Sequence, residues 1–67
     1  LKTGDAEIAI REFNASLEIK PDQALSLYGR GLARIKAGHI REGGADKASA
    51  LALDPAIARQ FSGYGLE

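Results

Sequence analysis

The sequence contains no cysteine, no methionine and no tryptophan, and it has no excess of charge of either sign. Without cysteine it can form no disulfide, no thiolate zinc site and no thiol nucleophile. Its nine basic and nine acidic side chains cancel, whereas proteins that bind nucleic acid usually carry a basic excess. No run of about 20 apolar residues is present, as a membrane-spanning helix requires. We therefore predict no nucleic-acid partner and no membrane insertion.

Large apolar side chains are scarce as well. The 67 residues include two Phe and two Tyr, and alanine supplies much of the apolar content. Alanine suits close contact between helices but buries little surface per residue. A chain of this length makes one small domain, which we expect to be marginally stable.

What the sequence does contain is helical periodicity. Ile10, Phe13 and Leu17 recur at helical spacing, and Pro21 must end their helix because the residue before a proline is pushed out of the α region. No segment shows the period-two alternation of a strand. The pattern predicts an all-α chain of four helices, near residues 6–20, 22–37, 40–53 and 55–62.

The glycines in the first half are assigned to turns and to helix contacts. Gly4 and Gly38 are predicted to form turns with positive φ, and Asp5 to cap the helix after Gly4. Gly29 and Gly31 lie inside the second predicted helix, where each costs roughly 1 kcal/mol of helix propensity. This cost predicts close approach by a neighbouring helix at both positions.

Two dipeptides shape the second half. The pair Gly43-Gly44 weakens the third helix by roughly 2 kcal/mol, so we expect fraying or a kink there. The pair Asp54-Pro55 is a helix-start signal, with Asp54 as the N-cap and Pro55 at the first helical position.

Identical or similar residues also repeat at a separation of 34 positions. The pairs are Gly4/Gly38, Leu17/Leu51, Ile19/Leu53, Pro21/Pro55, Ala24/Ala58, Gly29/Gly63 and Gly31/Gly65. A period of 34 is the length of the tetratricopeptide repeat, a pair of antiparallel helices that stacks on its neighbours.

The segment 24–55 resembles one complete tetratricopeptide repeat. The matching positions are Leu27, Gly31, Ala33, Gly38, Ala50 and Pro55. Three positions depart from the family: Arg34 replaces a Tyr, Lys47 a large apolar residue, and Gly43 an Ala. The chain is similar to a degenerate repeat of bacterial proteins. The resemblance implies antiparallel helix-turn-helix repeats in a right-handed α-solenoid fragment.

The resemblance also divides the single domain of residues 1–67. Residues 1–21 correspond to the second half of one repeat and residues 22–55 to a full repeat. Residues 56–65 correspond to a capping helix, and residues 66–67 are set apart as a possible cloning scar.

The function implied by the resemblance is a protein–protein interaction scaffold. Arrays of this family hold a peptide or a partner helix in a groove lined by the first helix of each pair. By position, the peptide-binding residues are Leu25, Tyr28, Leu32, Ile35 and Lys36. The alternative is a structural spacer or oligomerisation segment of a larger bacterial protein, with no ligand of its own.

The first predicted helix lacks the helix that would precede it in a complete array. We expect the one helix that follows to leave part of its apolar face uncovered, and hence the chain to form a homo-oligomer. The contact would use the first helices or exchange helices between chains. The predicted self-association residues are Ile8, Ile10, Phe13 and Leu17.

Catalytic and metal-binding patterns are weak. His39 and Glu42 have a spacing that can place two metal ligands on one helix face, but two ligands make a poor site, and we interpret His39 as a solvated turn residue. Arg30 and Arg34, one turn apart, could grip a carboxylate or phosphate together, or each could pair with nearby acids. We predict no enzymatic activity, no metal site and no cofactor.

Overall fold

The computed structural model of the chain describes residues 3–59, which form three α-helices and one further helical turn. The helices are α1 (Thr3–Ile19), α2 (Ala24–Lys36) and α3 (Ile40–Leu53), and the turn covers residues 57–59. No strand occurs in this range, which confirms the all-α prediction. The predicted fourth helix, near 55–62, extends past residue 59 and so lies partly outside the described residues.

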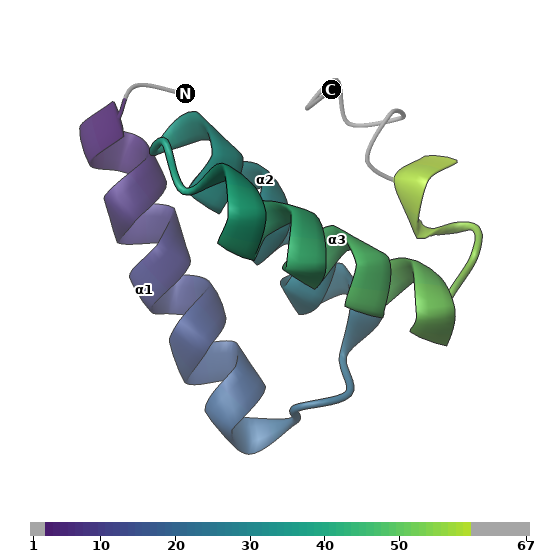
Figure 1. Cartoon of the computed structure of the whole chain (residues 1–67). Coiled ribbons are helices and arrows are strands. Elements are labelled where there is room, and N and C mark those ends of the chain that lie inside the picture. The colour runs from purple at the N-terminus through teal and green to yellow at the C-terminus, as the bar shows by residue number, and fades with distance from the viewer. Residues whose placement is uncertain (1–2, 60–67) are drawn as a thin grey trace.

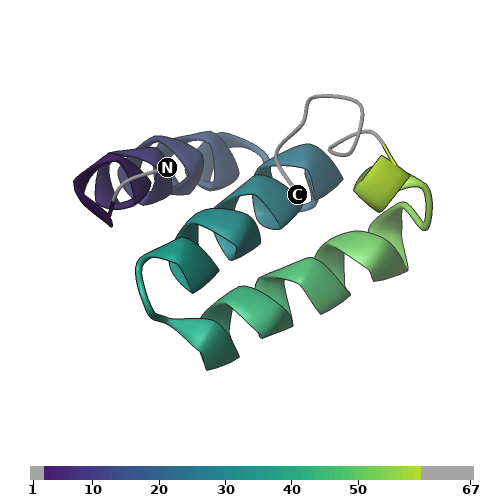
Figure 2. The same cartoon turned by 90° about the horizontal axis from the view of Figure 1, so that it is seen from above.

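Helix α2 is the central element. It packs against α1 on one side and α3 on the other, whereas α1 and α3 make no close backbone contact with each other. Each helix runs in the opposite direction to the one before it (Figures 1 and 2). The side chains of α2 therefore decide how the two outer helices are held.

The break between α1 and α2 lies where proline places it. The amide of Lys20 still donates to the carbonyl of Ser16 at 3.0 Å, and the chain leaves the helix at Pro21. Helix α2 begins at Ala24 rather than at residue 22, because Gln23 is in the extended region with ψ 104°. The side-chain oxygen of Gln23 accepts hydrogen bonds from the hydroxyls of Ser16 and Ser26.

The predicted turn at Gly4 is wrong. Helix α1 already includes Gly4 and Asp5, and among the described residues only Gly38 has a positive φ. Asp5 does not precede the helix as a cap but lies in its first turn, where a carboxylate interacts favourably with the helix dipole. Glycine is tolerated there because few intrahelical contacts surround the first turn.

The predicted turn at Gly38 is confirmed, with φ at 96°. The amide of Gly38 donates to the carbonyl of Ile35 at 3.1 Å, and the amide of His39 donates to that of Arg34 at 2.7 Å. This pair of bonds is a Schellman motif, which satisfies the last carbonyls of a helix and requires a left-handed residue. It reverses the chain within three residues and sets α3 antiparallel to α2.

Close contact between α2 and α3 occurs through two glycines. A Cβ atom on Gly31 would lie 2.7 Å from the carbonyl oxygen of Gly43, and one on Gly43 would likewise overlap Gly31. The predicted close approach at Gly31 is thus confirmed. Of the predicted fraying or kink at Gly43-Gly44, fraying is not seen, because α3 is helical from Ile40 to Leu53 and Gly43 is buried against α2, and the kink stays a prediction.

The apolar core joins α2, α3 and the turn after α3. Its buried members are Tyr28, Ala50 and Ile57, with Ala24, Leu27, Leu32 and Ala58 packed around them. The side chain of Asp54 accepts a hydrogen bond from the amide of Ala56 at 3.0 Å. This is the predicted cap, and it turns the chain so that Ile57 reaches the core.

The face of α1 that was expected to be uncovered is largely covered by α2. Ile10 and Leu17 are buried, and Phe13 is half-buried with its ring against Gly29, where a Cβ atom would overlap the ring. Of the four predicted self-association residues only Ile8, at 49% exposure, faces solvent. Glycine at position 29 makes this coverage possible, because it lets the ring lie on the backbone of α2.

Candidate functional site

A buried carboxylate lies at the centre of a polar cluster that joins all three helices. Asp46 on α3 is 6% exposed. The Nε and Nη2 atoms of Arg30 donate to its two oxygens at 2.8 Å each, and Nη1 of Arg34 donates at 2.8 Å. The Nη1 atom of Arg30 donates to Oδ1 of Asn14 on α1 at 2.9 Å. We call these four residues the Asp46 cluster.

The electrostatics of the Asp46 cluster are those of a closed structural site. Hydrogen bonding to Asp46 raises the pKa of Arg30, while burial acts in the opposite direction and the charge of Asp46 adds to the rise. Two guanidinium groups around one carboxylate leave its oxygens fully engaged. Among the described side chains, no buried nitrogen or oxygen lacks a hydrogen-bond partner.

The two arginines were predicted to grip an anion or to pair with nearby acids, and the structure shows the second outcome. Their common partner is Asp46, which lies 16 residues from Arg30 and 12 from Arg34. Sequence reasoning missed Asp46. One feature of the sequence did point to it. Arg34 and Lys47 occupy positions at which the tetratricopeptide family, which the chain resembles, has large apolar residues, and basic residues at such positions indicate that a buried acid lies nearby.

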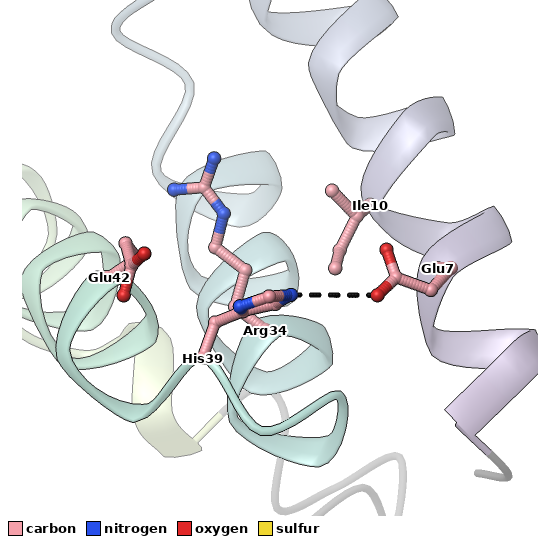
Figure 3. A pocket seen from close by; sticks show the side chains of 5 residues that line it. All are labelled: Glu7, Ile10, Arg34, His39 and Glu42. Atoms are coloured by element: carbon pink, nitrogen blue, oxygen red, sulfur yellow. Dashed lines mark ion pairs between the residues drawn. The ribbon is translucent and has the colours of Figure 1, made fainter.

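A shallow pocket of about 190 Å³ lies above Arg34, between α1 and the start of α3. Figure 3 shows its five lining side chains, which come from all three helices and from the turn before α3. They are Glu7, Ile10, Arg34, His39 and Glu42. The Nε2 atom of His39 lies 3.5 Å from Oε2 of Glu7, an ion pair when the imidazole is protonated.

This pocket mixes charges of both signs at its mouth. The side chains of His39 and Glu7 are 48% and 54% exposed, so their pairing is solvated and weak. Although His39 and Glu42 both line the pocket, the described residues include no group of three or more His, Cys, Asp or Glu placed to hold a metal ion. The lining of the pocket includes no serine, threonine or cysteine that could act as a nucleophile beside His39 and the two glutamates.

The predicted peptide-binding residues of α2 do not share one exposed surface. Tyr28 is only 2% exposed and belongs to the core, where the Nζ atom of Lys47 lies 5.3 Å from the centroid of its ring. Ile35 is half-buried and close to Gly43. Tyr28 therefore cannot contact a partner while the core is intact, which corrects its assignment to an open groove.

The other three predicted residues do lie on one side of α2. Leu25, Leu32 and Lys36 are spaced by seven and four positions, which places them along one face of a helix. Leu25 is 41% exposed, Lys36 is exposed, and Leu32 is half-buried. We call these three residues the α2 stripe.

Large aliphatic side chains are exposed on each helix. They are Ile8, Ile19, Leu25, Ile40, Leu51 and Leu53. Single exposed aliphatic residues are common on protein surfaces, so only their alignment along a helix carries information. Among the described residues, no helix is both long and apolar enough to cross a lipid bilayer.

Comparison of the chain with protein-family models, with curated proteins and with solved structures gives no match.

Proposed function

We propose that this chain is a non-catalytic protein-interaction module of the tetratricopeptide type. The 34-residue register supports the family, and the antiparallel order of α1, α2 and α3 is compatible with it. The observation that carries the function is the α2 stripe, in which an exposed leucine and an exposed lysine flank a half-buried leucine on the central helix. Such a surface suits a peptide with an apolar residue and a carboxylate.

The polar interior of the molecule favours binding over catalysis. The Asp46 cluster pairs Asp46, the one buried charged side chain among the described residues, with two half-buried guanidinium groups at 2.8 Å. Rearranging them for substrate chemistry would leave a buried charge unpaired, which is strongly destabilising. A structural cluster of this kind instead holds the helices in fixed positions, as a binding surface needs.

A display screen of random peptides against the immobilised chain tests this function. Selected peptides should lose binding to the Leu25→Asp and Lys36→Glu variants, while Arg59→Glu, an exposed charge reversal after α3, serves as the matched control. Binding that survives both α2 variants would show that the α2 stripe is the wrong surface. A screen that selects no peptide would favour the alternative of a structural spacer.

A further inference from the structure

Helix α1 carries an apolar row on the side that faces away from α2. The row consists of Ile8, Ala15 and Ile19, which lie along one face of a helix of about 3.6 residues per turn. Ile8 is 49% exposed, Ile19 is 88% exposed, and Ala15 is exposed as well. Leu17, which is buried against α2, lies on the opposite side of the helix from Ile8. We call these three exposed residues the α1 outer stripe.

The α1 outer stripe lies at one side of the molecule. Among the three helices, α1 packs on α2 and not on α3, and no other described element lies beyond α1 in either view (Figures 1 and 2). A helix of a second molecule can therefore lie along the whole stripe without meeting α2 or α3.

Two opposite charges border the stripe on the same side. Arg11 and Glu18 are both exposed. Their positions are seven residues apart, which is about 10 Å along the helix axis, so the two side chains are too far apart to pair within one helix. Within residues 3–59, neither side chain takes part in an ion pair or a hydrogen bond.

This arrangement of charges is complementary to itself when a second α1 lies antiparallel across the stripe. A two-fold axis that passes between the two helices, at right angles to them, keeps each border of one helix beside the same border of the other. With the axis between Asn14 and Ala15, positions 11 and 18 are equally far from it. Arg11 of each copy then lies level with Glu18 of the other copy, and two reciprocal ion pairs form.

The same axis brings the apolar residues of the two stripes together. Ile8 of one copy lies within about 3 Å, along the helix axis, of Ile19 of the other copy. The two Ala15 residues lie beside the axis, where small side chains let the backbones come close. One register thus satisfies both the charged and the apolar residues, so the α1 outer stripe matches a second copy of this chain.

We propose that the α1 outer stripe is the interface of a homodimer in which two α1 helices pack antiparallel about a two-fold axis. The contact uses one helix from each copy, which is a small interface, so its dissociation constant lies in the range of about 10 μM to 1 mM. This surface differs from the predicted one, because Ile10, Phe13 and Leu17 stay packed against α2 inside each copy. The α2 stripe takes no part in the contact, and the dimer does not depend on the proposed peptide binding.

Sedimentation equilibrium of the full chain, at concentrations from about 10 μM to 1 mM, tests the proposal. The mass should rise from that of the 7.1 kDa monomer towards twice this value. Ile8→Asp and Ile19→Asp should each raise the dissociation constant at least about ten-fold, because each places two charges in the apolar contact. Circular dichroism should show that both variants keep the helical content of wild type, since both positions are exposed in the monomer.

A charge exchange tests the register of the two helices. Glu18→Lys and Arg11→Glu should each raise the dissociation constant roughly three- to ten-fold, because each turns two attractive contacts into repulsive ones. The variant that carries both substitutions should return to within about two-fold of wild type, since the ion pairs form again with reversed signs.

Glu12→Lys is the matched control for Glu18→Lys. Glu12 borders the stripe on the other side, and in the proposed register it lies about 7–8 Å, along the helix axis, from the Glu12 of the other copy. It gains no partner in the dimer, so its replacement by lysine should not weaken the dimer.

Three results would overturn the proposal. The first is a chain that stays monomeric up to about 1 mM, the upper end of the proposed range. The second is a dimer that neither Ile8→Asp nor Ile19→Asp weakens, because such a dimer uses another surface. The third is a combined charge exchange that leaves the dimer as weak as the single variants do, because the two charges then do not face each other.

Discussion

The carbonyl oxygen of Gly43 lies 2.7 Å from the point where Gly31 would carry a Cβ atom, so the backbones of α2 and α3 meet there with no room for a side chain. Neither residue can be enlarged without moving a helix. The contact is a backbone contact, and no side chain can rotate away to relieve it.

The first prediction uses this contact. Gly31→Ala and Gly43→Ala should each lower the free energy of unfolding by about 1–3 kcal/mol, because an added methyl group overpacks a closed contact. Gly44→Ala is the matched control, one residue away in the same helix, where the space is empty. It should stabilise the chain by up to about 1 kcal/mol through helix propensity. Urea denaturation followed by circular dichroism measures all three, and equal effects at positions 43 and 44 would contradict the packing.

The second prediction concerns the buried carboxylate. Asp46→Asn should lower the free energy of unfolding by about 3 kcal/mol, because it leaves two guanidinium groups without their counter-charge. Their partial exposure, 19% for Arg30 and 26% for Arg34, keeps the loss at the low end of the range for buried pairs. Asp22→Asn, in the exposed turn, is the control. If Asp46→Asn and Asp22→Asn change the thermal unfolding of the chain equally, the Asp46 cluster contributes nothing to its stability.

The third prediction concerns the shape of Arg30. Arg30→Lys keeps the charge but cannot bond both oxygens of Asp46 and Asn14 at once, and should cost about 1–3 kcal/mol. Arg11→Lys, exposed on α1, is the control. Because the pKa of Arg30 is raised, its protonated form stabilises the fold at every pH below its ordinary value, and this contribution is lost only in strong alkali. Denaturation from pH 6 to pH 9 should therefore show a constant difference between wild type and Arg30→Lys.

The fourth prediction concerns the turn after α3. Ile57→Ala should destabilise the chain by about 2–4 kcal/mol, because Ile57 is only 1% exposed and packs on Tyr28 and Ala50. Leu53→Ala, at 51% exposure, should cost much less. If both substitutions have the same effect in urea denaturation, the turn is not part of the core.

The fifth prediction separates stability from self-association. Phe13→Ser should lower stability without changing the molecular mass in solution, because the ring packs on Gly29 inside the chain. Ile8→Asp should leave stability within about 0.5 kcal/mol of wild type, since Ile8 is an exposed residue of α1. Sedimentation equilibrium of both variants measures their molecular mass in solution. A dimer that dissociates in Phe13→Ser while the fold persists would restore the predicted isologous contact.

The parts of the fold that followed from the sequence are those governed by local sterics. Pro21 ends α1, Gly38 takes the left-handed region, and Asp54 caps the turn that follows α3. Each of these residues sets the backbone conformation of its own immediate segment, so its effect can be predicted from the local sequence alone. Gly4 has the same residue type as Gly38 but a helical conformation, because a glycine permits the left-handed region without requiring it.

The parts that could not be predicted depend on contacts between distant residues. Asp46 looks like a surface acid in the sequence, and only the packing of α3 on α2 brings it between Arg30 and Arg34. Tyr28 was assigned to an open surface because apolar residues on the broad face of α2 fit either a groove or a core. The covering of Tyr28 by Ala50 and Ile57 depends on where the chain turns after Asp54.

Helices α1 and α3 each pack against α2 and not against each other, so the angle between the two outer helices depends on how each is seated on α2. Among residues 4–59, two polar links connect the α1 side of α2 with the α3 side, one through the guanidinium of Arg30 and one from His39 to Glu7. Both links lie on the face of α2 that carries Arg34, and the α2 stripe lies on the opposite face. Bending should therefore be directional, with α1 and α3 swinging apart more easily over Leu25 and Lys36 than over Arg34.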